Sequence, residues 1–213
     1  MLKIGHRGAK GYVAENTFAS FQKAIDLNVD GIELDVHISS NKIPVIIHDE
    51  TIVRTTSGKG FVKNFTSLEL QSLGIPTLEE VIHLVNGTCF INIEIKDANA
   101  TIEVLKILEK HDLNLFQISS FDWNVLEEIS NLNSNIYLGV LTEDNLENAL
   151  TFAKKIKAKS INPYYKLLTL EKVTLLQENG FQVFPWTVND SSEIEKMKSY
   201  NVNGIISDFP DRI

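Results

Sequence analysis

The chain has 213 residues, of which 43% are hydrophobic and 23% charged, a composition typical of one globular domain that argues against intrinsic disorder. Its net charge of −8 argues against non-specific nucleic-acid binding, which needs a cationic face, but allows a local site for a small anion. Apolar runs such as Val45–Ile47 are too short to cross a bilayer, and no apolar signal core precedes Lys3. We therefore expect no membrane insertion and a cytoplasmic location.

Two local features have simple structural interpretations. The single cysteine, Cys89, excludes an internal disulfide, and its apolar flanks indicate a buried, inert thiol. The lysine-rich stretch Lys154–Lys159 is typical of a solvated helix end and less so of a lipid- or phosphate-binding patch.

Short β-rich runs alternate with helical patterns along the whole chain. Most of these runs are continuously apolar, which is typical of parallel strands covered by helices. The expected strands are Leu2–His6, Gly31–His37, Pro44–His48, Phe90–Ile95, Phe116–Ser119, Ile136–Leu141, Ser160–Asn162, Gln182–Trp186 and Gly204–Ile206.

Helix signals lie between most of these runs. Thr77–Glu80 is a capping box that begins one helix, and Gly87 ends it. Apolar residues at helical spacing predict six more helices. One begins near Thr17 and the last begins at Asp190. The four between them cover Ile102 to Leu108, Val125 to Leu132, Leu146 to Ala153 and Leu168 to Leu176.

Repeated strand–helix alternation predicts an α/β fold with a parallel sheet. Two arrangements fit: a TIM-type (β/α)₈ barrel and an open doubly wound sheet. The number of units favours the barrel, as a single domain over residues 1–213. Since the chain stops at Ile213, soon after the last strand, the eighth helix must be short or missing.

The run Pro44–His48 follows Gly31–His37 too closely for a helical crossover, which needs about ten residues or more. We interpret Ser39–Lys42 as a turn, and the second run as an antiparallel or accessory strand.

Charged residues gather where the expected strands end. Glu33 and Asp35 lie two apart in one strand and so face the same way, as do Glu94 and Lys96 in the next barrel strand. In a barrel these ends meet at the C-terminal mouth. Three carboxylates there predict a hard divalent cation such as Mg²⁺ or Ca²⁺. The alternative is that they only form ion pairs with Arg7 and Lys96.

Histidines also lie at strand ends and suit acid–base chemistry near neutral pH. His6, beside Arg7, and His48, beside Asp49, are the candidates. For His37 we favour a structural role. His83 and His111 lie on predicted helices and are expected at the surface or in packing.

Several motifs occur in a recognisable order. They are Gly5–Gly8, Glu15–Thr17, Gly31–Val36, Pro44–Asp49, Arg54–Gly60, Ile75–Glu80, Glu94–Lys96, Trp186–Asn189 and Gly204–Pro210. Together they resemble the glycerophosphodiester phosphodiesterase family over essentially the whole chain.

The resemblance implies a TIM barrel that hydrolyses glycerophosphodiesters to sn-glycerol 3-phosphate and an alcohol in lipid breakdown. It also implies one divalent cation, Mg²⁺ or Ca²⁺ with Mn²⁺ possible, and a small-molecule substrate. The implied site residues are Glu33, Asp35 and Glu94 for the metal, His6 and His48 for acid–base catalysis, Arg7 and Lys96 for the phosphate, and Trp186 for the pocket wall near the glycerol or the phosphate.

One departure from the family concerns the segment after His48-Asp49. Relatives carry a longer insertion there, whereas in this chain Leu70–Gly74 leads almost directly into Ile75-Pro76. We expect a more open mouth, which leaves the substrate choice open.

Formal charges at this site add to zero when three carboxylates, a divalent cation, Arg7, Lys96 and a monoanionic diester are counted. One histidine would take a proton from the nucleophile and the other would protonate the leaving alkoxide. The nucleophile is either a substrate hydroxyl, through a cyclic phosphate, or water.

Three alternatives remain at this stage. They are a lysophospholipase D-like phosphodiesterase of the same superfamily, a glycosidase using Glu33 and Glu94, and a non-catalytic phosphoester-binding barrel. The glycosidase has no use for Arg7 and Lys96, and the non-catalytic barrel has none for His6 and His48.

Overall fold

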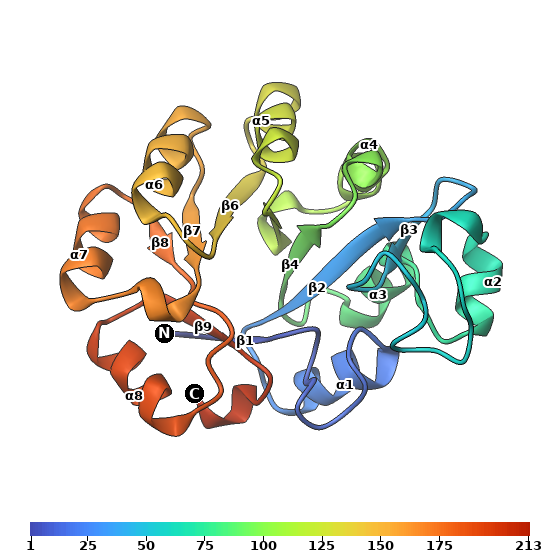
Figure 1. Ribbon diagram of the computed structural model, residues 1–213, viewed down its shortest axis with the longest axis horizontal. Coiled ribbons are helices and arrows are strands. Elements are labelled where there is room, and N and C mark those ends of the chain that lie inside the picture. The colour runs from blue at the N-terminus through green and yellow to red at the C-terminus, as the bar shows by residue number, and fades with distance from the viewer.

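Parallel pairing joins eight strands in the order β8-β7-β6-β5-β4-β2-β1-β9. The computed structural model describes residues 1–213, and in it the strands form a ring inside a layer of helices (Figure 1). The strands are β1 Leu2–Gly5, β2 Gly31–Ile38, β4 Phe90–Ile95, β5 Phe116–Ser120, β6 Tyr137–Thr142, β7 Ser160–Pro163, β8 Gln182–Val183 and β9 Gly204–Ser207.

The ring closes through backbone hydrogen bonds between β9 and the segment after β8. Ile206 N–H donates to the Pro185 carbonyl at 3.0 Å, and Val188 N–H donates to the Ile206 carbonyl at 3.0 Å. The regular part of strand β8 ends at Val183, not at Trp186 as expected, although Trp186 N–H still donates to the Pro163 carbonyl of β7 at 3.1 Å. The nearly closed ring confirms the TIM barrel and rules out the open sheet.

Helices begin at polar caps between the strands. Thr17, Thr77, Asp122, Asn145, Thr169 and Asp190 each accept a hydrogen bond from a backbone N–H in the first turn of the helix that follows. The outer helices are α1 Phe18–Asp26, α3 Leu78–Val85, α4 Thr101–Leu108, α5 Trp123–Leu132, α6 Leu146–Lys155, α7 Leu170–Glu178 and α8 Ser191–Ser199.

Short 3₁₀ turns complete the helical structure. They are Val62–Asn64, Ala98–Ala100, Leu113–Leu115, Tyr165–Leu167 and Pro210–Arg212. Only the last of them follows β9, where the eighth helix was expected to be short or missing. None of the helices has the length and apolar character required to traverse a membrane.

Strand β2 shows how the barrel divides apolar from polar side chains. Ile32, Leu34 and Val36 point outward and are fully buried in the apolar layer between the strands and the helices. Glu33 and Asp35, which alternate with them along the strand, point to the inner face of the barrel. Further inside the barrel, polar groups bond to one another. Gln117 Nε2 donates to Ser160 Oγ at 2.6 Å, and Ser160 Oγ donates to Asn162 Oδ1 at 2.8 Å.

The segment between β2 and α3 forms an accessory unit. Strand β3, Pro44–Ile46, pairs antiparallel with β2, as expected, and the short helix α2, Ser67–Ser72, follows. Its side chains pack in a cluster of their own, comprising Val45, Ile47, Ile52, Val62, Leu70 and Ile75. Helix α2 was not expected, although the capping box of Thr66 and Glu69 marks its start. The unit places His48, just after β3, at the mouth.

Candidate active site

The turn after β1 needs glycine at two positions. A Cβ on Gly5 would lie 2.3 Å from the Gly8 carbonyl oxygen, and one on Gly8 would lie 2.5 Å from Ser20 Oγ. Arg7 lies between them with a φ of 51°, a left-handed conformation that is unusual for arginine. This tight turn directs the Arg7 backbone N–H to Glu33 Oε2, at 2.9 Å.

Three carboxylates meet above the barrel interior. One oxygen each from Glu33, Asp35 and Glu94 lies within 4.8 Å of the others, and all three side chains are buried. They meet because β2 and β4 pair in a register that sets Asp35 beside Glu94. Glu33 Oε1 and Asp35 Oδ1 are buried without a hydrogen-bond partner, although the Lys96 ammonium is 3.2 Å from the latter.

The surroundings shift the pKa values of these three carboxylates in different directions. Burial, then the charges of Asp35 and Glu94, raise the pKa of Glu33 well above its usual value. Burial and the charge of Asp35 raise the pKa of Glu94 to about 7. Burial also opposes ionisation of Asp35, but the charges of Lys96 and Arg7 outweigh it and lower its pKa. Full ionisation of all three groups therefore requires positive charge beyond that of Lys96 and Arg7.

Ion pairs with Arg7 and Lys96 account for only part of the cluster. Arg7 Nε lies 3.2 Å from Asp35 Oδ2, and Lys96 contacts both Asp35 and Glu94. Glu33 has no such side-chain partner, since it accepts only the Arg7 backbone N–H and lies 3.9 Å from His6 Nε2. The unpartnered oxygens and the oxygen-only donor set fit a hard divalent cation.

Both candidate histidines are held by a carboxylate on Nδ1. His6 Nδ1 lies 2.6 Å from Asp208 Oδ1, and His48 Nδ1 lies 2.7 Å from Asp49 Oδ1. Such a partner keeps the proton of a neutral ring on Nδ1 and leaves Nε2 as the basic atom. Burial lowers the pKa of both rings despite the nearby carboxylates, so both are largely neutral at pH 7.

The remaining histidines lie outside this arrangement. His37 is 8% exposed, and its Nε2 is 3.1 Å from the carbonyl oxygen of His48, a packing contact of the kind expected. His83 bonds to the Glu79 carbonyl on α3, and His111 packs edge-on against Phe116.

A cavity of about 110 Å³ opens where these groups converge. All the expected site residues line it except Asp35, which is 1% exposed and lies beneath them. The rest of the wall consists of the apolar Phe121, Leu141 and Ile206 and the polar Asn92 and Thr187. Trp186 is fixed by a 2.7 Å hydrogen bond from its indole N–H to the Asn162 carbonyl. One cavity thus offers a charged side and an apolar side.

Sequence reasoning missed the residues that support this site. Asp208 accepts from Asn189 Nδ2 at 2.8 Å, Asn16 Nδ2 donates to Asp35 Oδ2 at 2.8 Å, and Arg54 bonds to both Glu15 and Asp49. The available signal was a concentration of charged and amide side chains in the loops that follow the strands.

Glu15 provides a test of this supporting network by pH. Burial opposes its ionisation, but hydrogen bonds from Arg54 and Arg7 lower its pKa from 4.5 to about 2. The depressed pKa means that its stabilisation is present above the unfolded-state pKa and disappears as the pH falls towards the folded one. Urea unfolding should therefore show wild type more stable than Glu15→Gln at about pH 6, with the difference shrinking from about pH 5 to pH 2. A difference that does not change with pH would contradict this.

The comparisons with known proteins agree with this geometry. The model of the glycerophosphoryl diester phosphodiesterase family matches residues 6–212. A glycerophosphodiester phosphodiesterase of Caldanaerobacter subterraneus subsp. tengcongensis is 35% identical over 232 residues, covering 100% of this chain and 96% of the relative. Because this alignment is longer than the 213-residue chain, the relative carries insertions that the chain lacks.

Solved structures show the same fold. A glycerophosphodiester phosphodiesterase from Thermotoga maritima superposes with a TM-score of 0.90 at 30% identity, covering 99% of this chain and 96% of that one. An Oleispira antarctica phosphodiesterase in complex with the product sn-glycerol-3-phosphate gives 0.91 at 26% identity, covering 99% and 94%. The family match over nearly the whole chain and these similarities establish that the chain belongs to the glycerophosphoryl diester phosphodiesterase family and is a phosphodiesterase.

Proposed function

We propose that this enzyme hydrolyses glycerophosphodiesters to sn-glycerol 3-phosphate and an alcohol, with a divalent cation, in glycerophospholipid breakdown. The observation that carries the proposal is one cavity lined by two histidines, two cationic side chains and two carboxylates, Glu33 and Glu94, which form a cluster with the buried Asp35. The Oleispira phosphodiesterase, which holds sn-glycerol-3-phosphate as its product, supports the same product for this chain.

Glu33, Asp35 and Glu94 would hold the cation. Carboxylate oxygens are preferred by Mg²⁺ and Ca²⁺, and Mn²⁺ accepts them too. When bound, the ion supplies Lewis-acid neutralisation of charge on the phosphoryl oxygens. Burial, and then the neighbouring carboxylate charges, raise the pKa of Glu33 and Glu94, so both groups suit a site that also holds a cation.

Arg7 and Lys96 would bind the phosphate. The guanidinium of Arg7 presents a planar fork that can contact two phosphate oxygens, whereas Lys96 acts as a compact charge. Both already border the carboxylates, so an incoming diester would meet two cationic side chains beside the anionic cluster. The carbon atoms of glycerol would pack against Trp186 in the same cavity.

His6 and His48 would share the two proton transfers. Each presents Nε2 while Nδ1 is held by a carboxylate, so one ring can accept the proton of the nucleophile and the other, once protonated, can supply the leaving oxygen. If a substrate hydroxyl attacks, a cyclic phosphate forms; if water attacks, none does. A slow variant that accumulates the cyclic product would identify the first route.

The histidine roles predict large kinetic effects with little loss of stability. His6→Ala or His48→Ala should each lower kcat by about 10²–10⁴, because one proton transfer is lost. Glycerol 3-phosphate release from glycerophosphocholine measures this, with His83→Ala on α3 as the matched control and thermal unfolding as the check on folding. Near-full kcat in either variant would remove that histidine from catalysis.

Cation dependence predicts loss of activity on chelation. EDTA should abolish turnover, and Mg²⁺, Ca²⁺ or Mn²⁺ should restore it. The same ions should raise the Tm of the wild type, since they bind the folded cluster, and should raise that of Glu33→Gln much less. Undiminished turnover after thorough chelation would defeat the metal assignment.

Substrate size separates this activity from a lysophospholipase D-like one. The cavity of about 110 Å³ has room for a phosphoryl group with its glycerol, and its apolar wall is short. We expect glycerophosphocholine to be hydrolysed with a higher kcat/KM than lysophosphatidylcholine. The reverse order would assign the lysophospholipase activity, and turnover of neither would favour a non-catalytic barrel.

A further inference from the structure

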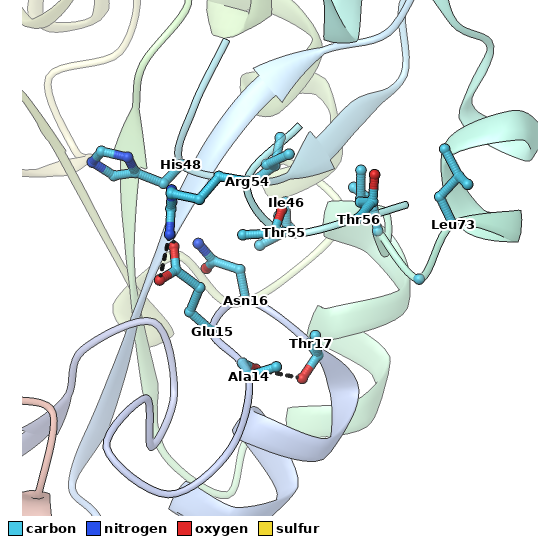
Figure 2. Close-up of a pocket in the computed structure, with 13 residues that line it drawn as sticks. Ala14, Glu15, Asn16, Thr17, Ile46, His48, Arg54, Thr55, Thr56 and Leu73 are labelled. Atoms are coloured by element: carbon cyan, nitrogen blue, oxygen red, sulfur yellow. Dashed lines mark hydrogen bonds and ion pairs between the residues drawn. The ribbon is translucent and has the colours of Figure 1, made fainter. Parts of the chain in front are cut away.

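Arg54 lies between two carboxylates from different parts of the mouth. Its Nε and Nη2 donate to the two oxygens of Asp49 at 2.6 and 3.0 Å. Its Nη1 and Nη2 donate to the two oxygens of Glu15 at 3.0 and 2.7 Å, and Figure 2 shows this second pair. Every carboxylate oxygen of Asp49 and Glu15 is therefore bonded to one guanidinium.

Each of these carboxylates continues to a site residue. Asp49 Oδ1 lies 2.7 Å from His48 Nδ1, and Arg7 Nη1 donates to Glu15 Oε1 at 2.8 Å. An unbroken series of charged contacts thus runs from His48 through Asp49, Arg54 and Glu15 to Arg7. It connects the loop after β3 with the turn after β1, two segments that no strand pairing joins.

Resting on the proposed function, we propose that Arg54 is a positioning residue for phosphodiester hydrolysis. It holds Asp49 so that His48 keeps its proton on Nδ1 and presents Nε2, and it holds Glu15 so that Glu15 orients the guanidinium of Arg7. Arg54 does not line the cavity of about 110 Å³ that His48 and Arg7 share, and in this proposal it acts through these neighbours.

The geometry of the contacts requires arginine. Two forked carboxylate pairs use the planar arrangement of guanidinium donors, and a lysine ammonium cannot satisfy four oxygens in that plane. Asp49 has a side-chain exposure of 28% and would otherwise be free to turn towards water. Without the two hydrogen bonds from Arg54, the Asp49 carboxylate would move more freely and would hold His48 Nδ1 less firmly.

A second cavity next to Arg54 makes a direct chemical test possible. It has a volume of about 350 Å³ and lies between the start of α1, the loop after β3 and the end of α2 (Figure 2). Arg54 lines it with a side chain that is 45% exposed, so a small cation from solvent can reach the position that a shorter side chain would vacate.

Activity, rescue and stability are measured together on Arg54→Ala and Arg54→Lys. Both should lower kcat about 10–100-fold, as lost outer-shell partners do, with a smaller change in KM. Added guanidinium at millimolar, non-denaturing concentrations should restore part of the kcat of Arg54→Ala and none of that of His48→Ala. Lys110→Ala removes a remote surface ion pair with Glu79 and should change neither kcat nor the response to guanidinium.

Mutant cycles and NMR test the routes through Asp49 and Glu15. The effect of Arg54→Ala should largely disappear in an Asp49→Asn/Glu15→Gln background, because both contacts that carry it are already broken. Nitrogen shifts of the imidazole rings should show His48 protonated on Nδ1 in the wild type and on a mixture of nitrogens in Arg54→Ala. Additive effects on kcat, or an unchanged His48 tautomer, would overturn the proposal, as would wild-type kcat in Arg54→Ala.

Two substrates keep this outcome distinct from failure of the proposed function. Assays use glycerophosphocholine and the chromogenic diester bis(p-nitrophenyl) phosphate. If the wild type hydrolyses only the chromogenic diester, the proposed glycerophosphodiester substrate is refuted. The role of Arg54 can then still be tested by comparing the kcat of wild type and Arg54→Ala on the chromogenic diester, and by the His48 tautomer. Turnover of both by wild type and by Arg54→Ala at equal rates would refute only the role of Arg54.

Discussion

The arrangement of the mouth follows from three carboxylates that are buried within 4.8 Å of one another. Like charges at this distance in a poorly solvated place are unfavourable unless protons, cations or hydrogen bonds offset them. The structure supplies Arg7 and Lys96, whose charges lower the pKa of Asp35, whereas burial and the neighbouring carboxylates still raise the pKa values of Glu33 and Glu94. The remaining deficit of positive charge makes this cluster suited to a divalent ion and a phosphate that arrives with it.

Residues in the loops after the strands hold the side chains of the site in place through hydrogen bonds. Asp208 with Asn189 fixes His6, and Asp49 with Arg54 fixes His48. Catalytic groups must be held closely in place for proton transfer, and residues on loops gain that precision only from such partners. The apolar wall contributes in the same way, because Trp186 is bonded to the backbone of β7.

Much of this architecture could be predicted from the sequence. Continuous apolar runs identified the strands, and the two-residue spacing of Glu33 and Asp35 placed both on the inner face. Helix α2 was missed because six residues give too little periodicity, and β8 was overestimated because its regular part covers only Gln182–Val183, with single hydrogen bonds to β7 beyond it. The link from Glu15 through Arg54 to Asp49 could not be foreseen, since spacing within one loop does not report contacts between loops. The assigned roles of the site residues, the single-domain boundaries, the cytoplasmic location and the absence of nucleic-acid partners stay predictions.

The pairing of β1 with β9 has a consequence for how the enzyme becomes active. It joins Leu2 to Gly204, and the bond between His6 and Asp208 spans 202 positions. A growing polypeptide can form most of its strand pairs before these partners emerge from the ribosome, but His6 has no carboxylate on Nδ1 until they do. The contact between His6 and Asp208 is therefore completed late in biosynthesis, after most of the barrel has been made.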